Sequence, residues 1–224
     1  RPGAEIAGPL RISMPSDLGR NIVLPWLDEF QRLYPKITLH LRVSDHMADF
    51  FQQALDAGLR YGQLSDSSLV ALPIAPDNRR VLCASPDYVA RHGRPRTPDD
   101  LSAHNCLLFV LKEQTYERWK FHLPEGVKTI SVKGDRLSDD AELVRRWAVD
   151  GLGVAYKSRI DFLPDLKAGR LVELCPPQYG DPVPLQAGAA GIALMGVALF
   201  TGPENTPDRL ARALITAGYG DDAK

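Results

Sequence analysis

The stretch Asp56-Ala57-Gly58-Leu59-Arg60-Tyr61-Gly62 is a short apolar run that ends at a glycine turn. The stretch Ser138-Asp139-Asp140 followed by Gly151-Leu152-Gly153-Val154-Ala155-Tyr156 joins a polar turn to a second such run. Buried strands that end in turns of this kind form ligand crevices in α/β sheets. Neither stretch holds a nucleophile with its base, a metal cluster or a phosphate loop, so the sequence favours recognition over turnover.

Composition indicates a soluble globular protein without a nucleic-acid surface of its own. The chain has 224 residues, of which 44% are hydrophobic and 25% charged, and its formal net charge is -1. A nucleic-acid binder carries a marked basic excess, which is missing here. The cysteines, Cys83, Cys106 and Cys175, are odd in number and widely spaced, which fits a reducing cytoplasm and small buried hydrophobic positions.

The first third predicts a parallel βαβ lobe. A strand over 10–14 ends at Pro15, and Ser16 stands where a helix N-cap is expected. Apolar residues at three- and four-residue steps predict a helix up to Pro35, kinked at Pro25. Alternation over Ile37–Val43 predicts a half-buried strand, and a helix over 47–54 leads to a strand over 56–61.

The remaining pattern predicts a second lobe and a return to the first. Ser85-Pro86 and Thr97-Pro98 predict helix starts, an Asp139–Glu142 capping box starts another helix, and Gly151 suits its C-terminal cap. An extended run is expected over 69–75, a new pattern starts over 79–84, and strands are expected over 106–110, 118–121, 127–132, 153–156 and 170–174, with a last helix over 206–217. We expect a linker over 1–9, lobe I over 10–75 plus 179–218, and lobe II over 76–178.

Residues 183–202 carry no charge, and about twenty apolar residues suffice to span a bilayer. Pro184, Gln186 and several glycines argue against that interpretation. We expect no membrane contact.

Four stretches together resemble the effector-binding domain of LysR-type transcriptional regulators. They are Gly8-Pro9-Leu10-Arg11-Ile12 before Pro15-Ser16; residues 56–62 with Asp66-Ser67-Ser68-Leu69-Val70; residues 80–88 with Asp100-Leu101 and His104-Asn105-Cys106; and residues 151–155 with residues 165–172. The resemblance covers residues 8–178. Any one of the four stretches alone would be weak evidence, and their occurrence in this order makes the evidence strong.

The resemblance implies two Rossmann-like α/β lobes, similar to type 2 periplasmic binding proteins, with a small effector in a cleft between them. It also implies a DNA-binding winged helix-turn-helix before residue 1, so that DNA contact belongs to that segment. A homodimer or tetramer is implied, and we expect self-association through the Ser16–Tyr34 helix and the Ile37–Val43 strand.

Two features depart from the family pattern. Asp139 and Ala141 stand where members often have Asn and Gly. Residues 186–202 are rich in alanine and glycine and do not resemble the closing strand of the family. We therefore consider a change of reading frame after about Gln186, which resequencing of the gene with an intact-mass measurement would decide.

Polar residues at the predicted strand ends are the candidate effector contacts: Ser16, Asp17, Ser44, Arg60, Tyr61, Asp139, Asp140 and Tyr156. Ser16 can offer its hydroxyl and nearby amides to an anion, or simply cap its helix. Arg60 can form a bidentate pair with an effector carboxylate, or pair internally with Asp56 or Asp66. Asp139 and Asp140 can bind a hydroxyl or an amine, or cap a helix. Ser44 can simply form a polar turn.

Three classes of function remain open. The first is the ligand-sensing domain of a transcription factor, which binds a small, anionic effector. A solute-binding protein of a transporter shares the architecture, and an enzyme on the same scaffold is the third class. No catalytic residue, metal site or cofactor is expected, because the five histidines share no ligand spacing and no catalytic motif occurs.

Overall fold

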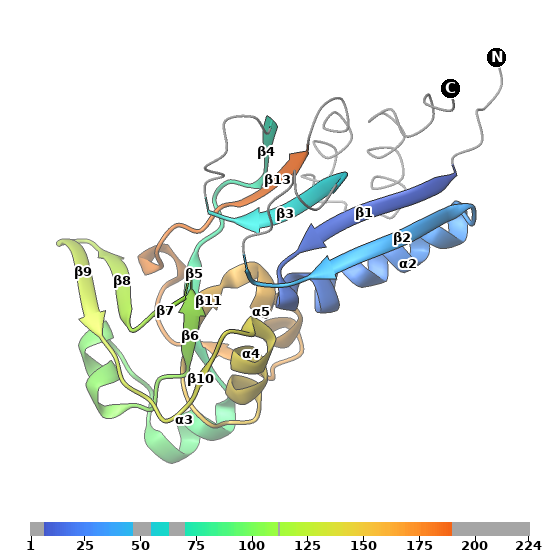
Figure 1. Cartoon of the computed structure of the whole chain (residues 1–224). Helices are drawn as coiled ribbons and strands as arrows, with labels where there is room; N and C mark the ends of the chain where they lie inside the picture. Colours follow the sequence, from blue (N-terminus) through green and yellow to red (C-terminus); the bar gives the residue numbers. More distant parts are fainter. Residues whose placement is uncertain (1–6, 47–54, 63–69, 112, 190–224) are drawn as a thin grey trace. The chain divides into compact units, whose positions relative to one another are not determined.

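The computed structural model describes residues 7–46, 55–62, 70–111 and 113–189, and the chain forms two compact units (Figure 1). The first unit comprises Arg1–Pro76 with Pro184–Lys224, and the second comprises Asp77–Val183. Residues 179–183, assigned to the first lobe from the sequence, belong to the second unit. There, the Val183 amide donates to the Asn78 carbonyl at 2.9 Å, and Gly180 forms a bridge with Phe121.

The first unit is built on a five-stranded sheet with the order β2-β1-β3-β13-β4. Its strands are β1 (Gly8–Met14), β2 (Ile37–Val43), β3 (Ala57–Tyr61), β4 (Val70–Ala75) and β13 (Leu185–Ala189). Strand β1 is parallel to both β2 and β3, as the βαβ pattern predicts. The carboxyl ends of these three strands therefore lie along one edge of the sheet.

The helical segment after β1 changes its winding just before Pro25. It consists of α1 (Ser16–Leu18), a π-helical segment over Gly19–Val23, and α2 (Leu24–Leu33), which runs along β1 and β2 in Figure 1. Proline lacks an amide proton and its ring collides with the preceding turn, so a wider π turn accommodates it. The irregularity predicted at Pro25 is present. Leu27 and Phe30 of α2 are buried.

The closing strand of the first sheet is formed by residues that the sequence did not predict for it. Strand β13 lies antiparallel between β3 and β4, with Gln186 opposite Arg60 and Gly188 opposite Gly58. Residues 186–189 belong to the stretch that does not resemble the closing strand of the family, yet they pair with both neighbouring strands. The linker expected over 1–9 ends earlier, because Gly8 and Pro9 belong to β1. The rest of the alanine- and glycine-rich stretch, residues 1–6 and the helices expected over 47–54 and 206–217 lie outside the described residues.

The second unit contains three small sheets, with strand orders β11-β5-β12, β10-β6-β7 and β8-β9. The strands are β5 (Arg80–Ala84), β6 (Leu108–Leu111), β7 (Gln114–Thr115), β8 (Arg118–Leu123), β9 (Gly126–Ser131), β10 (Leu137–Ser138), β11 (Ala155–Ser158) and β12 (Val172–Glu173). The helices are α3 (Pro86–His92), α4 (Ala141–Val149) and α5 (Arg159–Lys167), with 3-10 segments over Pro98–Ala103 and Pro177–Tyr179. The β8–β9 hairpin confirms the antiparallel pair expected from the sequence.

Most local capping signals of the second unit are confirmed. The Ser85 hydroxyl accepts the Tyr88 amide at 3.1 Å, Thr97 and Asp100 form a capping box, and Gly151 follows α4 with a φ of 76°. The capping box predicted at Asp139 is wrong. Asp140 caps α4 by accepting the Glu142 amide at 2.9 Å, so the helix begins one residue later than expected.

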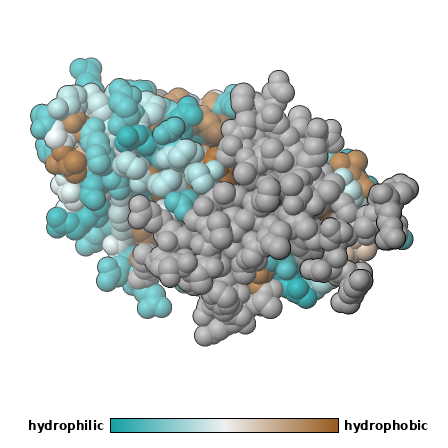
Figure 2. Space-filling view, turned by 90° about the horizontal axis from the view of Figure 1, so that it is seen from above, coloured by the Kyte–Doolittle hydropathy of each residue, from teal (hydrophilic) through white to brown (hydrophobic). Residues whose placement is uncertain are grey.

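The second unit has its own apolar core, centred on Trp119, Phe121, Leu101 and Tyr156. Figure 2 shows one face of the molecule, on which hydrophilic residues predominate around the β8–β9 hairpin with isolated hydrophobic residues among them. The exposed Val127 on β9 is one hydrophobic residue of the hairpin. None of the helices in the described part of the chain is both long and apolar enough to cross a membrane.

Candidate functional site

The polar residues of the first unit gather where its parallel strands end. Ser16 follows β1, Ser44 and Asp45 follow β2, and Arg60 lies at the end of β3. This edge is where open α/β sheets bind ligands, because successive turns there expose side chains and amides together. The sequence predicted this arrangement from the strand pattern alone.

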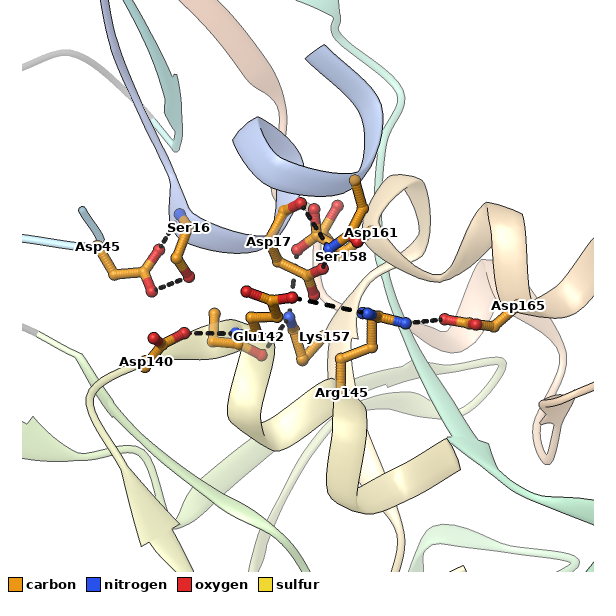
Figure 3. Close-up of polar contacts among 12 residues, drawn as sticks. Ser16, Asp17, Asp45, Asp140, Glu142, Arg145, Lys157, Ser158, Asp161 and Asp165 are labelled. Carbon is orange, nitrogen blue, oxygen red and sulfur yellow. Dashed lines mark hydrogen bonds and ion pairs between the residues drawn. The ribbon is translucent and has the colours of Figure 1, made fainter. Parts of the chain in front are cut away.

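Ser16 is held by a single carboxylate. Its amide donates to Oδ1 of Asp45 at 2.9 Å and its hydroxyl donates to Oδ2 at 2.5 Å, as Figure 3 shows. Ser16 is buried, and its side chain forms no helix cap; the N-cap position is Pro15. The predicted N-cap role of Ser16 is therefore wrong, because its hydroxyl points to Asp45 instead of an amide of its own helix.

Arg60 is a buried cation with only uncharged hydrogen-bond partners among the described residues. Its residue surface is 8% exposed. One terminal nitrogen donates to the Ser13 hydroxyl at 2.5 Å and the other to the Leu59 carbonyl at 2.6 Å. Burial lowers the pKa of Arg60 from its ordinary value, and the negative charge of Asp45 acts in the opposite direction.

Asp56, one of the two carboxylates considered as internal partners of Arg60, is bound to Arg11 instead. Asp56 accepts the Arg11 amide at 2.7 Å and lies 3.8 Å from the Arg11 guanidinium. No carboxylate of the described residues forms an ion pair with Arg60, and Asp66 lies outside them. A guanidinium removed from water without a carboxylate is suited to bind an anion.

The other predicted contacts of the first unit have mixed surroundings. Ser44 forms the polar turn that the sequence left open, since its hydroxyl accepts the His46 amide at 3.1 Å. Asp17 is buried and accepts the side-chain amide of Asn21 at 2.9 Å. Tyr61 is half-buried at the end of β3. None of these observations tests their assignment to an effector.

In the second unit, the predicted contacts are mostly occupied by structural roles. Asp139 is exposed, and Asp140 caps α4. The Tyr156 hydroxyl donates to the Lys120 carbonyl at 2.6 Å and accepts the Asp181 amide at 2.7 Å. Burial raises the pKa of Tyr156, so its hydroxyl stays neutral. Its assignment to the effector stays a prediction, although both hydrogen bonds already serve the fold.

Lys157 is a residue whose environment the sequence did not reveal. Lysine is mostly a surface residue, whereas Lys157 is 5% exposed. Its ammonium donates to the Ala141 carbonyl at 2.9 Å and lies 3.5 Å from Asp161 (Figure 3). Lys157 lies in β11 and Asp161 in the first turn of α5, so the pair joins a strand to the helix that follows it.

A second buried charge cluster has Asp165 at its centre. Its two oxygens accept hydrogen bonds from Arg145 and Arg170, each at 2.7 Å, and its residue surface is 0% exposed. Because a buried carboxylate is costly unless paired, this cluster reads as structural.

The described residues contain no set of three or more histidine, cysteine, aspartate or glutamate side chains placed to hold a metal ion. The three cysteines are buried and reduced. Burial raises the pKa of Cys106 to about 12, which keeps its thiol protonated and unreactive.

Comparison with known proteins supports this description. The family model described as LysR substrate binding domain matches residues 3–216. The HTH-type transcriptional regulator DmlR of Escherichia coli K12 is 34% identical over 172 residues, which are 77% of this chain and 56% of DmlR. The transcriptional activator TtdR of the same strain is 30% identical over 169 residues, 75% of this chain and 54% of TtdR. The chain thus spans about half the length of these relatives.

Solved structures agree in fold. The regulatory domain of CrgA, a LysR-type transcriptional regulator from Neisseria meningitidis, is 25% identical with a TM-score of 0.75, over 93% of this chain and 99% of that domain. A longer CrgA structure has a TM-score of 0.75 at 24% identity, over 96% of this chain and 69% of CrgA. The two-lobed, periplasmic-binding-protein-like architecture is the one expected from the sequence. On the evidence of its fold and of the family match, the chain belongs to the LysR substrate-binding domain family.

Proposed function

We propose that this chain is the effector-sensing part of a transcriptional regulator and that it binds a small anion through Arg60 and Ser13. The observation that carries the proposal is the buried guanidinium, whose described partners are a hydroxyl and a carbonyl. Desolvation of a cation is costly, and an anionic ligand would return the lost electrostatic stabilisation. A ligand that offers two oxygens fits the planar fork of arginine.

The relatives support a regulatory role over the transport alternative, because DmlR and TtdR are named as transcriptional regulators. By this proposal, DNA contact and function in the cytoplasm belong to the whole regulator, of which this chain is one part. The effector would act through unequal affinity for two conformations of the regulator. Self-association as a dimer or tetramer, through α2 and β2, is part of the same proposal.

Thermal-shift measurements on the chain test the anion site. Succinate and benzoate serve as carboxylate probes and butylamine as a cationic probe. A ligand that binds the folded state raises the melting temperature by mass action. We expect a shift with at least one carboxylate and none with butylamine.

Arg60→Ala should abolish the carboxylate shift, whereas Arg11→Gln should retain it. Arg11 is the matched control, since it lies on the same sheet and its loss removes the same charge from a half-exposed position. An equal carboxylate shift in wild type and Arg60→Ala would refute the proposed site.

A further inference from the structure

Asp45 occupies the hydrogen-bond donors that the first unit has beside Arg60. Both the amide and the hydroxyl of Ser16 donate to its carboxylate, at 2.9 and 2.5 Å. These are donors of the kind that the sequence analysis expected to bind an external anion at Ser16. In this structure, the anion in front of them is a side chain of the protein itself (Figure 3).

The same carboxylate also acts electrostatically on Arg60. Its negative charge opposes the effect of burial on the pKa of Arg60. Ser13, which accepts from Arg60, and Ser16, which donates to Asp45, flank the carboxyl end of β1. A ligand carboxylate that reaches Arg60 therefore enters the field of Asp45, and like charges repel over such distances in a partly buried site.

We propose that Asp45 is an internal competitor of the anionic effector, which binds fully only when the Asp45 carboxylate gives up the two Ser16 donors. The inference rests on the proposed function, since it presumes anion binding at Arg60. Asp45 would then set the affinity without touching the ligand. It is half-buried in the turn after β2, a position where a side chain can change rotamer without disturbing the core.

Calorimetric titration of the 224-residue chain with the carboxylate probe that gives the larger thermal shift, succinate or benzoate, tests the inference. Asp45→Asn keeps the shape and an acceptor oxygen but removes the charge. Loss of one like charge in a partly buried site should tighten binding roughly ten-fold. Asp45→Ala also removes the acceptor oxygens and should tighten binding at least as much. This second variant covers the case in which the asparagine side chain itself keeps the Ser16 donors occupied.

Asp56→Asn is the matched control. Asp56 is a carboxylate of the same unit, and it binds Arg11 rather than Ser16 or Arg60. Its loss should change the affinity by less than about two-fold at physiological salt, because exposed charges are screened. If Asp56→Asn tightens carboxylate binding as much as Asp45→Asn does, the effect comes from the net charge of the protein alone, and the inference is overturned.

The two ideas fail in different ways. If Arg60→Ala binds the probe as well as wild type does, the anion site itself is wrong. If Arg60→Ala loses binding while both Asp45 variants bind no tighter than wild type, the site stands and the competitor is refuted. If no variant binds either carboxylate, both proposals fall.

Discussion

Loss of the Arg60 cation should by itself cost the fold little, even though the residue is 8% exposed. Moving an ion out of water costs several kcal/mol, and a hydrogen bond to a charged group returns roughly 1.5–3 kcal/mol. Arg60 has such a bond to Ser13 and another to the Leu59 carbonyl. These terms nearly cancel, so removal of the cation by itself should change the free energy of unfolding by no more than about 1 kcal/mol, and the main cost of Arg60→Met should come from the partner that it leaves unpaired.

A double variant sharpens this prediction. Arg60→Met alone leaves the buried Ser13 hydroxyl without its donor, and an orphaned buried polar group costs about 1–3 kcal/mol. Arg60→Met with Ser13→Ala removes the cation and its acceptor together. We expect this double variant to be as stable as wild type or more stable by about 1 kcal/mol, while carboxylate binding is lost.

Urea unfolding measures the whole chain, and hydrogen exchange of peptides from β1 and β3 reports on the first unit separately. Arg11→Met is the control. Its half-exposed ion pair with Asp56 is worth about 0–1 kcal/mol. A loss of more than about 2 kcal/mol in the double variant would show that a carboxylate of the protein holds Arg60, and Asp66 is the alternative that the sequence names. Such a loss would contradict the near-cancellation of the desolvation and hydrogen-bond energies of Arg60.

Three further predictions concern the second unit. Tyr156→Phe should lower the free energy of unfolding by about 1–3 kcal/mol, because the Asp181 amide and the Lys120 carbonyl lose their buried partner. The thermal shifts caused by carboxylates should stay unchanged. Unchanged stability together with altered thermal shifts would instead make the Tyr156 hydroxyl an effector contact. Neutral His104 accepts a hydrogen bond from the Tyr88 hydroxyl at 3.0 Å. Burial, followed by the charge of His92, lowers the pKa of His104. The contribution of His104 to stability is therefore present above about pH 6.5 and declines as the pH falls through the lower folded-state pKa. Urea titrations from pH 8 to 5 should therefore show a smaller acid loss in His104→Phe, and an identical pH profile would contradict the assignment. Asp165→Asn should destabilise the chain by about 3–5 kcal/mol in urea, since two arginines lose their shared carboxylate, and a loss below about 1 kcal/mol would rule out a structural role for the cluster.

The sequence predicts what is decided locally. Alternation over Ile37–Val43 and the pairs Ser85-Pro86 and Thr97-Pro98 each act within a few residues, and the structure confirms them. The edge at which β1, β2 and β3 end was predictable too, because parallel pairing follows from the βαβ order. Asp140 shows how finely a capping signal places the start of a helix. Asp139 and Asp140 are equally good cap candidates in the sequence, and only the structure shows that Asp140 is the cap.

What depends on distant partners was not predictable. Strand β13 is stabilised by pairing with β3 and β4, more than a hundred residues earlier, so its own small residues say little about it. Lys157 carries no local mark that distinguishes a buried ammonium from an exposed one. The partner of Ser16 is Asp45, 29 residues further along the chain, and only the fold brings the two together.

The polar residues at the strand ends therefore fall into two groups, according to whether the protein itself satisfies their hydrogen bonds and neutralises their charge. Tyr156 has its donor and its acceptor satisfied by backbone groups, so a ligand would have to replace bonds that the fold needs. Arg60 keeps a positive charge that its hydroxyl and carbonyl partners do not neutralise. Recognition should concentrate where a ligand adds what the fold lacks, since displacing a satisfied bond yields little net free energy. We therefore propose that effector binding depends on Arg60 because of this difference, rather than because Arg60 lies at a strand end.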